Sequence, residues 1–331
     1  MSSDRSIGLE DIVAAQGRIA GTVHRTRTEL SAHLSDKTGV PVHLKLEHHQ
    51  RTGSFKLRGA TNAVLQLSDA QRARGVVGVS TGNHGRGLAY AARQNGVRCI
   101  ICMSELVPQN KIDGIKAQGA EVRIVGRSQD DAQVEVDRLV AEGMTMIPPF
   151  DHPDIIAGQG TIGLELVDDL PDLTTVMIQL SGGGLISGVA AALKARIPGI
   201  RVIGVSMERG AAMYQCQQAG QPMIVPELAT LADSLGGGIG SDNAYTFGMT
   251  RDLVDEIVLV SEAEIAAAVR HAYWCENQII EGSGSVGIAA LLSGKVKPNG
   301  PAALLLSGGN IDMVLHHRII GGEDVDVTGE H

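Results

Sequence analysis

Short apolar runs alternate with longer helical patterns along most of this 331-residue chain, and this alternation limits the possible folds more than any other feature. VVGVS (76–80) and VMIQL (176–180) have the length and the β-branched content of buried strands. Segments with helical periodicity, 85–94 and 185–196, come soon after them. Repeated strand–helix alternation predicts parallel sheets with helices on both faces, so the expected fold class is α/β.

The same pattern divides the chain into two expected domains. The block 48–142 has a strand–helix set of its own and is expected to form a small domain, while 1–47 and 143–331 form a larger one. Further strands are expected at 42–47, 97–103, 121–125, 200–207, 256–260 and 302–306, and further helices at 54–67, 109–118 and 128–142. Ligands of open α/β sheets bind beyond the carboxyl ends of the strands, where this chain has its glycine-rich segments.

Charge and composition argue against several classes of protein. The formal net charge of −9 argues against a general nucleic-acid partner and against a polybasic membrane anchor. No stretch approaches the roughly 18 apolar residues of a membrane span, and residues 1–6 lack the apolar core of a signal peptide. Cys99 and Cys102 form a C-x-x-C, which we interpret as part of a buried strand because no second pair completes a zinc site. The expected location is a reducing cytoplasm.

Lys56 stands in the first of five segments that carry candidate chemistry, TGSFKLRGA (52–60). Ser54 suits a helix N-cap, which would place Lys56 in the first turn. The positive end of the helix dipole should lower the pKa of the amine there, as a Schiff-base lysine requires. Taken alone, this position favours a solvated surface lysine, and the neighbouring segments change that interpretation.

The second and third segments follow predicted strands and open predicted helices. STGNHGRG (80–87) offers Asn83 as a donor and acceptor, and His84 as an acid or base, although packing is the favoured role for His84. SGGGLISG (181–188) supplies backbone N–H groups at a helix N-terminus, which is typical of a phosphate site. Its glycines, followed by Glu208 about 20 residues on, also resemble a dinucleotide fingerprint.

The fourth and fifth segments lie in the last fifth of the chain. SGGN (307–310) directly follows a predicted strand, and the hydroxyl of Ser307 can hydrogen-bond a ring nitrogen there. EGSGS (281–285) contains Glu281, which either faces the ligand or caps the helix that follows.

Together these segments give the chain a family resemblance. SFKLRGA, STGNHGRG, AGQGTIGLEL, SGGGLISG and SGGN occur in the order found in the fold-type II pyridoxal-phosphate (PLP) enzymes, which share a tryptophan synthase β-like fold. The chain resembles the serine/threonine dehydratase branch from about residue 8 to 318. LKLEHHQRTGSFKLRGATNAVL and LADSLGGGIG look most like the hydroxyectoine-utilization dehydratases.

The resemblance implies roles for the matching residues. Lys56 would hold the cofactor through a Schiff base and act as the catalytic base, in a site borne mainly by the larger domain. The other implied cofactor contacts are Phe55 beside the ring, Asn83 on the ring hydroxyl, Gly182, Gly183, Gly184 and Leu185 on the phosphate, and Ser307 on the pyridine nitrogen. The implied substrate contacts are Ser80, Thr81, Gly82, His84 and Glu281. Thr81 is also a candidate catalytic donor for the proton that the leaving hydroxide needs, the cofactor phosphate being the other.

The implied activity is a PLP-dependent ammonia-lyase that removes water and then ammonia from a 3-hydroxy-2-amino acid. Threonine and serine are the default substrates, and a hydroxylated 2,4-diaminobutyrate derivative follows from the finer resemblance. Glu281, Ser283 and Asp233 are candidates to bind such a side group. A homodimer is also implied. The alternatives are a racemase on the same scaffold, a PLP-binding protein without turnover and a dinucleotide-dependent oxidoreductase.

The chain departs from the patterns of related enzymes in three respects. Ser181 replaces the first glycine of the usual phosphate loop, but its N–H remains available for binding. Thr81 stands where racemising relatives have a serine, which argues against racemase activity. Alignment on Tyr214 places no carboxylate at the cation-ligand positions of some relatives, so no metal is predicted. The residues at those positions are Ser206, Gly210 and Ala212.

Overall fold

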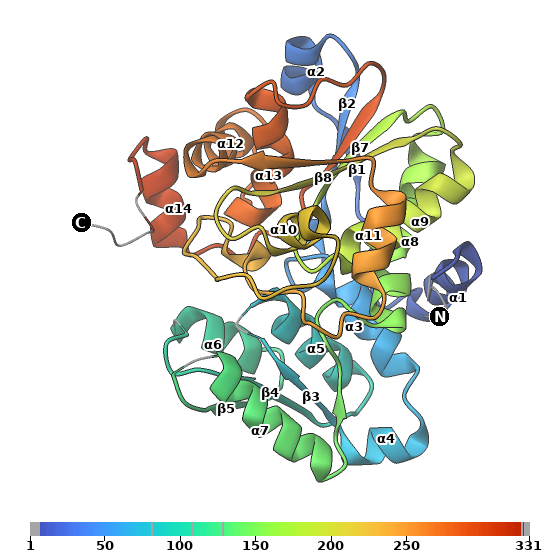
Figure 1. Ribbon diagram of the computed structural model, residues 1–331, viewed down its shortest axis with the longest axis vertical. Coiled ribbons are helices and arrows are strands. Elements are labelled where there is room, and N and C mark those ends of the chain that lie inside the picture. The colour runs from blue at the N-terminus through green and yellow to red at the C-terminus, as the bar shows by residue number, and fades with distance from the viewer. Residues whose placement is uncertain (1–6, 81, 108, 128, 326, 328–331) are drawn as a thin grey trace.

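Two separate β-sheets organise the molecule, each with helices packed against it (Figure 1). The computed structural model describes residues 7–80, 82–107, 109–127, 129–325 and 327, with only the backbone of Asn110, Gln129 and Asp130. The larger sheet lies in the upper part of Figure 1 and the smaller one in the lower part. We call the parts of the chain around these sheets the large domain and the small domain.

The large domain is built on a six-stranded sheet with the order β1-β2-β10-β7-β8-β9. Its strands are β1 (Thr28–Leu30), β2 (Val42–Lys45), β7 (Thr175–Gln179), β8 (Arg201–Met207), β9 (Glu256–Val260) and β10 (Ala302–Leu305). The expected parallel pairing is confirmed from β2 to β9. The edge strand β1, which the sequence did not predict, is antiparallel to its neighbour β2.

The small domain is built on a four-stranded sheet in which every pairing is parallel. Its order is β5-β4-β3-β6, with the bounds β3 (Val76–Val79), β4 (Cys99–Met103), β5 (Glu121–Ile124) and β6 (Thr145–Met146). Because β6 pairs with β3, this sheet extends past the expected domain boundary at residue 142. The boundary stays a prediction, and β6 favours an end a few residues later.

Alternate residues of the large sheet point into two different hydrophobic clusters, as strands buried on both faces require. Val176 and Ile178 of β7 pack with α8 (Pro153–Asp169) and α9 (Gly184–Arg196). Met177 packs with α12 (Glu262–Trp274) and α13 (Gly282–Leu292) on the other face. The other helical elements of this domain are α1 (Leu9–Ile19), α2 (Ala32–Thr38), η1 (Glu47–His49), α10 (Ala212–Ala219), η2 (Asp233–Leu235), α11 (Thr246–Leu253) and α14 (Met313–Ile320).

The small sheet is covered in the same way, and its central strand β4 contains the C-x-x-C. Cys99 packs towards α3 (Lys56–Leu65) and α5 (Asn83–Gln94), whereas Cys102 packs towards α7 (Gln129–Ala141). Both cysteines are buried and free, so the interpretation as a buried strand is confirmed. The other helices of this domain are α4 (Asp69–Arg74) and α6 (Gln109–Lys116).

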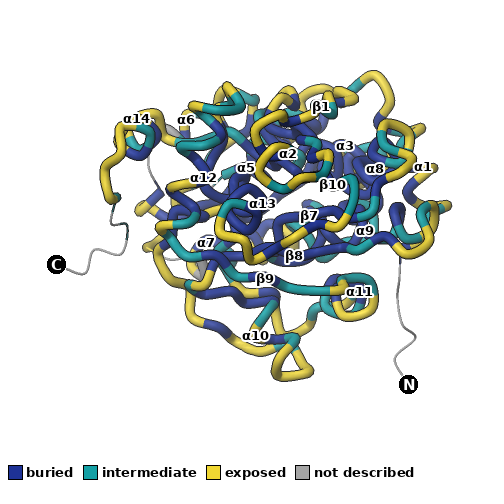
Figure 2. The backbone as a smooth tube through the Cα atoms, turned by 90° about the horizontal axis from the view of Figure 1, so that it is seen from above, coloured by how far each residue is buried: buried dark blue, intermediate teal, exposed yellow. Residues whose placement is uncertain are grey.

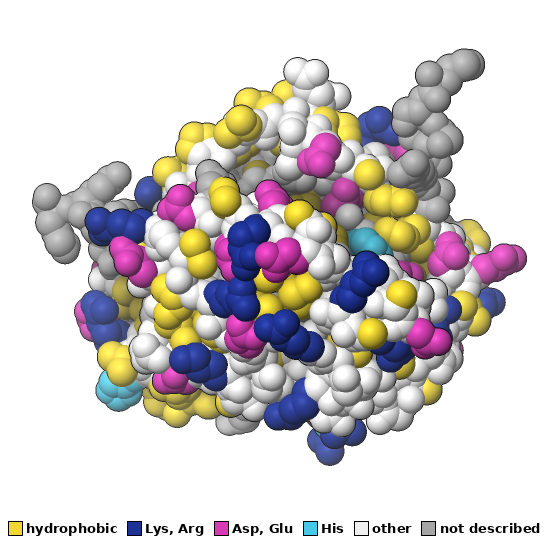
Figure 3. Space-filling view, turned by 90° about the horizontal axis from the view of Figure 1, so that it is seen from below, with side chains coloured by type: hydrophobic (Ala, Val, Ile, Leu, Met, Phe, Trp, Pro, Cys, Tyr) yellow, Lys and Arg dark blue, Asp and Glu magenta, His cyan; other side chains and the backbone are white. Residues whose placement is uncertain are grey.

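The surface of the small domain carries charges of both signs. Figure 3 views this side of the molecule and shows basic and acidic side chains interspersed. The residues of this domain form the exposed ion pairs Arg98–Glu121 and Arg138–Glu142 and the partly buried pair Arg123–Glu135. Such pairs contribute little to stability individually, so the sheets and their apolar layers hold this domain together.

The central strands of the large sheet are its most buried part. Figure 2 shows β7 and β8 as buried segments through the middle of the molecule, with exposed residues concentrated in the outer loops and helices. Within the described part of the chain, no helix has both the length and the apolar character needed to cross a bilayer. The carboxyl ends of β7 and β10 lead into the glycine-rich segments at 181–184 and 307–310.

Candidate cofactor site

Lys56 is the first residue of α3, as the sequence predicted, but the helix does not begin with a side-chain cap. The N-cap residue is Phe55, and the predicted capping role of Ser54 is wrong. Ser54 instead forms an antiparallel bridge with Gly308, and the N–H of Phe55 donates to the carbonyl oxygen of Ser307 at 3.0 Å. These backbone bonds attach the start of α3 to the segment that follows β10.

The amine of Lys56 points into a cavity and donates to the carbonyl oxygen of Pro149 at 2.7 Å. It also lies 5.3 Å from the ring centroid of Phe55. Burial lowers the pKa of Lys56 to about 8, although the negative charge of Glu281 acts in the opposite direction. The direction agrees with the sequence-based expectation, while the main cause is burial. A sizeable neutral fraction of this amine is therefore present near neutral pH.

Glycines follow β7 and line the same cavity as this amine. Gly183 has a left-handed φ of +89°, and α9 begins at Gly184. A Cβ atom on Gly182 would lie 2.4 Å from the ring of Phe150, and one on Gly184 would lie 2.8 Å from its carbonyl oxygen. Only glycine fits here without displacing Phe150. The first N–H groups of α9 lack intrahelical partners, so this turn can hold an anion.

Asn83 links the small domain to Glu281 of the large domain. Its Nδ2 donates to Oε1 of Glu281 at 2.7 Å, and its Oδ1 accepts from Nδ2 of Asn310 at 2.6 Å. The backbone N–H of Asn310 donates to the other carboxylate oxygen of Glu281 at 3.2 Å. Glu281 stands at the N-cap position of α13 without a side-chain cap bond, so its carboxylate faces the cavity.

Burial raises the pKa of Glu281 to about 7, and repulsion from Asp233 acts in the same direction. The hydrogen bond from Asn83 partly opposes this shift. Near neutral pH the cavity therefore holds a carboxyl group and an amine, Glu281 and Lys56, that both change protonation easily. Perturbed pairs of this kind are typical of functional sites.

His84 is buried, and its Nε2 lies 2.8 Å from the carbonyl oxygen of Ile147. Burial lowers its pKa to about 3, and the positive charge of Lys56 acts in the same direction. Since a carbonyl oxygen only accepts, Nε2 carries the proton of the neutral ring. This environment favours the packing role, and a contact between His84 and substrate stays a prediction.

The loop before α5 holds the other predicted substrate residues. The hydroxyl oxygen of Ser80 accepts from the N–H groups of Gly82 at 3.3 Å and Gly85 at 2.9 Å. Ser80 and Gly82 both line the cavity. Thr81 lies outside the described residues, so its predicted roles have no structural account here.

The predicted residues therefore come together around one cavity of about 170 Å³. Of the described ones, all line it: Phe55, Lys56, Ser80, Gly82, Asn83, His84, Gly182, Gly183, Gly184, Leu185, Glu281 and Ser307. They come from both domains and from segments that lie far apart in the sequence. Such convergence of an amine, an anion-binding turn and neutral polar groups is typical of a phosphorylated-cofactor site.

A family model described as pyridoxal-phosphate dependent enzyme matches residues 19–308. The chain belongs to this PLP-dependent enzyme family. The family assignment goes against a dinucleotide-dependent oxidoreductase, for which the glycines after β7 were the main evidence.

Several relatives are similar over most of their length. A protein of Sinorhizobium fredii, provisionally named as a threonine dehydratase, is 61% identical over 97% of this chain and 98% of its own. The L-threonine ammonia-lyase of Thermotoga maritima is 41% identical over 95% of this chain and 78% of its own. Accordingly, this chain is a PLP-dependent lyase. This assignment argues against the alternative of a PLP-binding protein without turnover.

Solved structures confirm the expected fold-type II class. Threonine deaminase isoform 2 from Solanum lycopersicum, in its processed form, has a TM-score of 0.85 and 34% identity, covering 96% of this chain and 90% of its own. Maize serine racemase has a TM-score of 0.90 and 33% identity, covering 95% of this chain and 97% of its own.

The residues present in this lyase fit PLP. The glycine turn and α9 suit a phosphate, and Lys56 suits the aldehyde carbon. Three residues that line the cavity have buried polar atoms without a partner: Nδ1 of His84, Oε1 of Gln179 and Oγ of Ser283. Since buried polar groups are normally satisfied, these atoms indicate that a polar ligand belongs here.

Sequence reasoning missed several residues of the site. Pro149 and Phe150 lie in the connection from β6 to α8 and supply the lysine acceptor and the wall of the glycine turn. Gln179, the last residue of β7, donates to the carbonyl oxygens of Leu305 and Gly284. Of the missed residues, only Asn310 had a usable signal, since it ends the SGGN segment.

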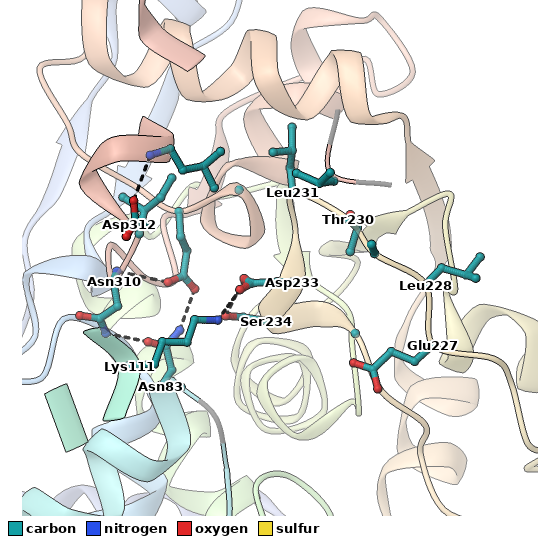
Figure 4. A pocket seen from close by; sticks show the side chains of 18 of the residues that line it. Asn83, Lys111, Glu227, Leu228, Thr230, Leu231, Asp233, Ser234, Asn310 and Asp312 are labelled. Atoms are coloured by element: carbon teal, nitrogen blue, oxygen red, sulfur yellow. Dashed lines mark hydrogen bonds and ion pairs between the residues drawn. The ribbon is translucent and has the colours of Figure 1, made fainter. Parts of the chain in front are cut away.

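A second cavity of about 490 Å³ adjoins the first. Asn83, Lys111, Asp233 and Glu281 line both cavities. Figure 4 shows Lys111 of α6 pointing towards Asp233 of η2, with which it forms an ion pair across the two domains. Glu227 and Asp312 add carboxylates to this outer cavity.

The structure also bears on the cation positions considered from the sequence. Among the described residues, no group of three or more His, Cys, Asp or Glu side chains is arranged to hold a metal ion. Glu208, the nearest acid to those positions, accepts from the amine of Lys295 at 3.2 Å.

Proposed function

We propose that this lyase removes water and then ammonia from a 3-hydroxy-2-amino acid, giving a 2-oxo acid. The observation that carries the proposal is the single cavity shared by the Lys56 amine, the glycine turn and Ser307. The dehydratases and ammonia-lyases among the relatives support the reaction type. When bound, PLP supplies an electron-withdrawing ring that makes the Cα proton of an attached amino acid easier to remove.

The residues expected to contact the cofactor each have a proposed part in holding it. Lys56 bonds its aldehyde carbon, and Phe55 packs beside its ring. The N–H groups of 182–185 bind the phosphate. Asn83 donates to the ring hydroxyl through the second hydrogen of Nδ2, since the first is held by Glu281. Ser307 accepts or donates at the ring nitrogen.

Lys56 is the proposed general base. With its amine free, Nζ of Lys56 would take the proton from Cα of the bound amino acid. A pKa of about 8 leaves this amine neutral often enough near neutral pH to accept a proton, and still basic enough to hold it. Pro149 keeps Nζ in the cavity when the amine is free.

Ser307 favours elimination over other outcomes. Its hydroxyl is neutral, so it does not stabilise a proton on the ring nitrogen as a carboxylate would. A cofactor ring held in this way would withdraw less negative charge from Cα, which would favour loss of the β-hydroxyl. Thr81 is this chain's candidate donor for the proton that the departing hydroxide needs.

The substrate carboxylate is proposed to bind at the start of α5. Ser80 holds the N–H groups of Gly82 and Gly85, which shapes the turn. The N–H groups at the N-terminus of α5 then remain to bind an anion. Glu281 and Ser283 line the same cavity and can contact the substrate side chain.

The outer cavity supports a finer proposal for the substrate. The methyl group of threonine would leave most of its 490 Å³ empty. Its lining has four carboxylates and two cations, and this excess of acceptors suits a cationic or amide group. The carboxylates are Glu227, Asp233, Glu281 and Asp312, and the cations are Arg86 and Lys111. A hydroxylated 2,4-diaminobutyrate derivative, as in hydroxyectoine breakdown, has a nitrogen two carbons beyond Cα and fits this arrangement.

The test is a substrate panel with detection of 2-oxo acid and ammonia. Threonine, serine and hydroxyectoine breakdown intermediates are compared, with Lys56→Ala as the control. We expect product from at least one 3-hydroxy-amino acid, and neither product nor the visible absorption band of the lysine-bound cofactor in Lys56→Ala. Asp233→Asn should reduce kcat/KM for the nitrogen-bearing substrate and leave that for threonine unchanged. Absence of turnover with every 3-hydroxy-amino acid would overturn the proposal.

Racemisation is the second candidate, because maize serine racemase shares the fold closely. A racemase needs a proton donor on the face of Cα opposite Lys56, and related racemases place a serine where this chain has Thr81. A threonine hydroxyl turns less freely because its side chain is β-branched. Chiral analysis of recovered serine or threonine decides between the two activities.

We also propose a homodimer in a reducing cytoplasm. The family resemblance supports the dimer, and the four free cysteines support the location. Light scattering coupled to size exclusion measures the mass, and a monomer at micromolar concentration would contradict the first statement. Detection of the native protein outside the cytoplasmic fraction would contradict the second.

A further inference from the structure

Arg58 lies two residues after Lys56 on α3, yet its side chain leaves the cofactor cavity altogether. It is 0% exposed and reaches into the large domain. Residues two apart on a helix do not share a face, which explains why these two neighbours point to different regions. The function proposed above gives no role to Arg58.

Two carboxylates hold this guanidinium, each through two bonds. Glu47 accepts from Nε at 2.9 Å and from Nη2 at 2.7 Å. Glu165 accepts from Nη1 at 2.6 Å and from Nη2 at 2.9 Å. Thr161 accepts from Nη1 at 3.1 Å. This double fork fixes both the position and the plane of the Arg58 side chain.

A second buried cation balances the charge of this network. Lys45 is 0% exposed and lies 2.7 Å from Oε2 of Glu165. It also donates to the carbonyl oxygen of Thr26, whose hydroxyl donates to Glu47 at 2.5 Å. Two cations thus face two buried carboxylates, and loss of one member leaves an uncompensated charge. Such an arrangement tolerates little movement of α3.

Glu165 and Thr161 belong to AGQGTIGLEL, the family segment to which sequence reasoning gave no role, and this segment lies in α8. A Cβ atom on Gly158 would lie 2.6 Å from the Cα of Gly59, so the backbones of α8 and α3 are in contact. The N–H of Gly59 donates to Oε1 of Gln159 at 3.2 Å. Helix α8 therefore holds α3 beside Arg58.

The other side of α8 holds the helix of the phosphate turn. A Cβ atom on Gly188 of α9 would lie 2.2 Å from the carbonyl oxygen of Ile156 and 2.7 Å from the N of Gly160. Because α9 begins at Gly184, this contact positions the glycine turn as well. One helix thus contacts both the helix of Lys56 and the helix of the phosphate turn.

We propose that Arg58 is a positioning residue for Lys56. Its bonds to Glu47 of η1 and Glu165 of α8 fix the start of α3 on the large domain, and they thereby set the distance between Nζ of Lys56 and the glycine turn around Gly183. Arg58 touches neither cofactor nor substrate. The inference rests on the proposed function, since it takes Lys56 as the cofactor lysine and base. Displacements of about 1 Å in such a site cost large factors in rate.

A purely stabilising role predicts a different behaviour. Loss of a buried ion pair lowers stability wherever it lies, but the folded enzyme would keep its rate. Arg58→Lys retains the charge and loses the fork, so it tests geometry rather than charge. Glu165→Gln retains the shape and one oxygen, and it serves if Arg58→Lys fails to fold. Val64→Ala is the matched control, because Val64 is buried at the far end of the same helix.

The experiment compares these variants as holoenzymes, well below their unfolding temperatures. We expect Arg58→Lys and Glu165→Gln to lower kcat by about 10-fold to 100-fold with KM little changed. The pH midpoint of the visible absorption band of the lysine-bound cofactor should shift in both. Val64→Ala should lower the unfolding temperature without changing kcat or the band.

Two results would overturn the inference. One is a normal kcat and a normal band in Arg58→Lys and Glu165→Gln while the wild-type enzyme is active. The other is an equal loss of kcat in Val64→Ala at an equal loss of stability. A wild-type protein whose band does not depend on Lys56 would instead refute the proposed function, and this role of Arg58 with it.

Discussion

Nδ2 of Asn83 lies 2.7 Å from Oε1 of Glu281 and joins the first turn of α5 to the start of α13. Because the carboxylate accepts, the amide of Asn83 can have only one orientation, with its oxygen towards Asn310. The charge of Glu281 thereby controls a group that we assign to the cofactor ring. This bond also crosses from the small domain to the large one, so it ties domain arrangement to protonation.

The pKa of Glu281 predicts a pH-dependent stability. Its folded-state pKa of about 7 lies above the roughly 4.3 of an unfolded glutamate. Between these values the folded protein binds more protons, so the free energy of unfolding falls as the pH rises, and the contribution is lost above about 7. We expect the cofactor-free protein to lose about 2 to 3 kcal/mol from this source between about pH 5 and pH 8. Urea unfolding of wild type and Glu281→Gln measures it, and equal slopes would contradict it.

Gly183→Ala should weaken cofactor binding by at least about 10-fold, through loss of the turn that cradles the phosphate. Its Cβ would lie 2.9 Å from side-chain atoms of Met213 and Thr246, at a φ of +89°. Gly199→Ala is the matched control, with a φ of +83° and nothing within 4 Å of the added Cβ. Titration of both apo-variants with PLP compares their affinities for the cofactor. Both substitutions strain the backbone, but only Gly183→Ala also brings a Cβ atom against neighbouring side chains. Equal affinities would show that the space around Gly183 is unimportant.

Glu47→Gln should destabilise the protein by about 3 to 5 kcal/mol, because Arg58 then loses one of its two buried carboxylates. Glu142→Gln removes one of the two carboxylates paired with Arg138 on the surface and should cost less than about 1 kcal/mol. The free energies of unfolding in urea give both values under the same conditions. A similar loss of unfolding free energy for the two substitutions would mean that the buried network stabilises the protein no more than a surface ion pair does.

The thiols of Cys99 and Cys102 should be inert in the native protein. Burial raises their pKa values to about 12 and about 11, and the thiolate is the reactive form. Cys216 is buried as well, and Cys275 is the one cysteine with partial exposure. We expect a thiol reagent to label about one cysteine in the native enzyme and four in urea. Rapid labelling of Cys102 would contradict this reading of the strand.

Local sequence patterns were enough to predict a residue's structural role where that role depends on its neighbours in the sequence. The buried strands gave continuous apolar runs, and the glycine turn at 182–184 had the composition of an anion site. The same local reasoning failed for Ser54, which pairs with Gly308 rather than capping α3. It also missed β6, which has two half-buried residues and no apolar run.

The proposed role of Arg58 could not be predicted from local sequence either, because its contacts join residues that are distant in the sequence. One of its carboxylates lies 11 residues away and the other lies 107 residues away. Nothing near SFKLRGA indicates that these acids converge on one guanidinium. Pro149 likewise meets Lys56 across 93 residues. Contacts of this kind depend on how whole helices pack, which periodicity does not report.

The strand order of the large sheet has a consequence for synthesis. Since β10 is inserted between β2 and β7, a nascent chain that has not yet delivered residues 302–305 leaves two unpaired strand edges at the centre of its sheet. Ser307 and Asn310 leave the ribosome later still. The catalytic pocket is therefore among the last parts to form. Until then the growing polypeptide exposes unpaired strand edges, which are prone to aggregation and are expected to bind chaperones.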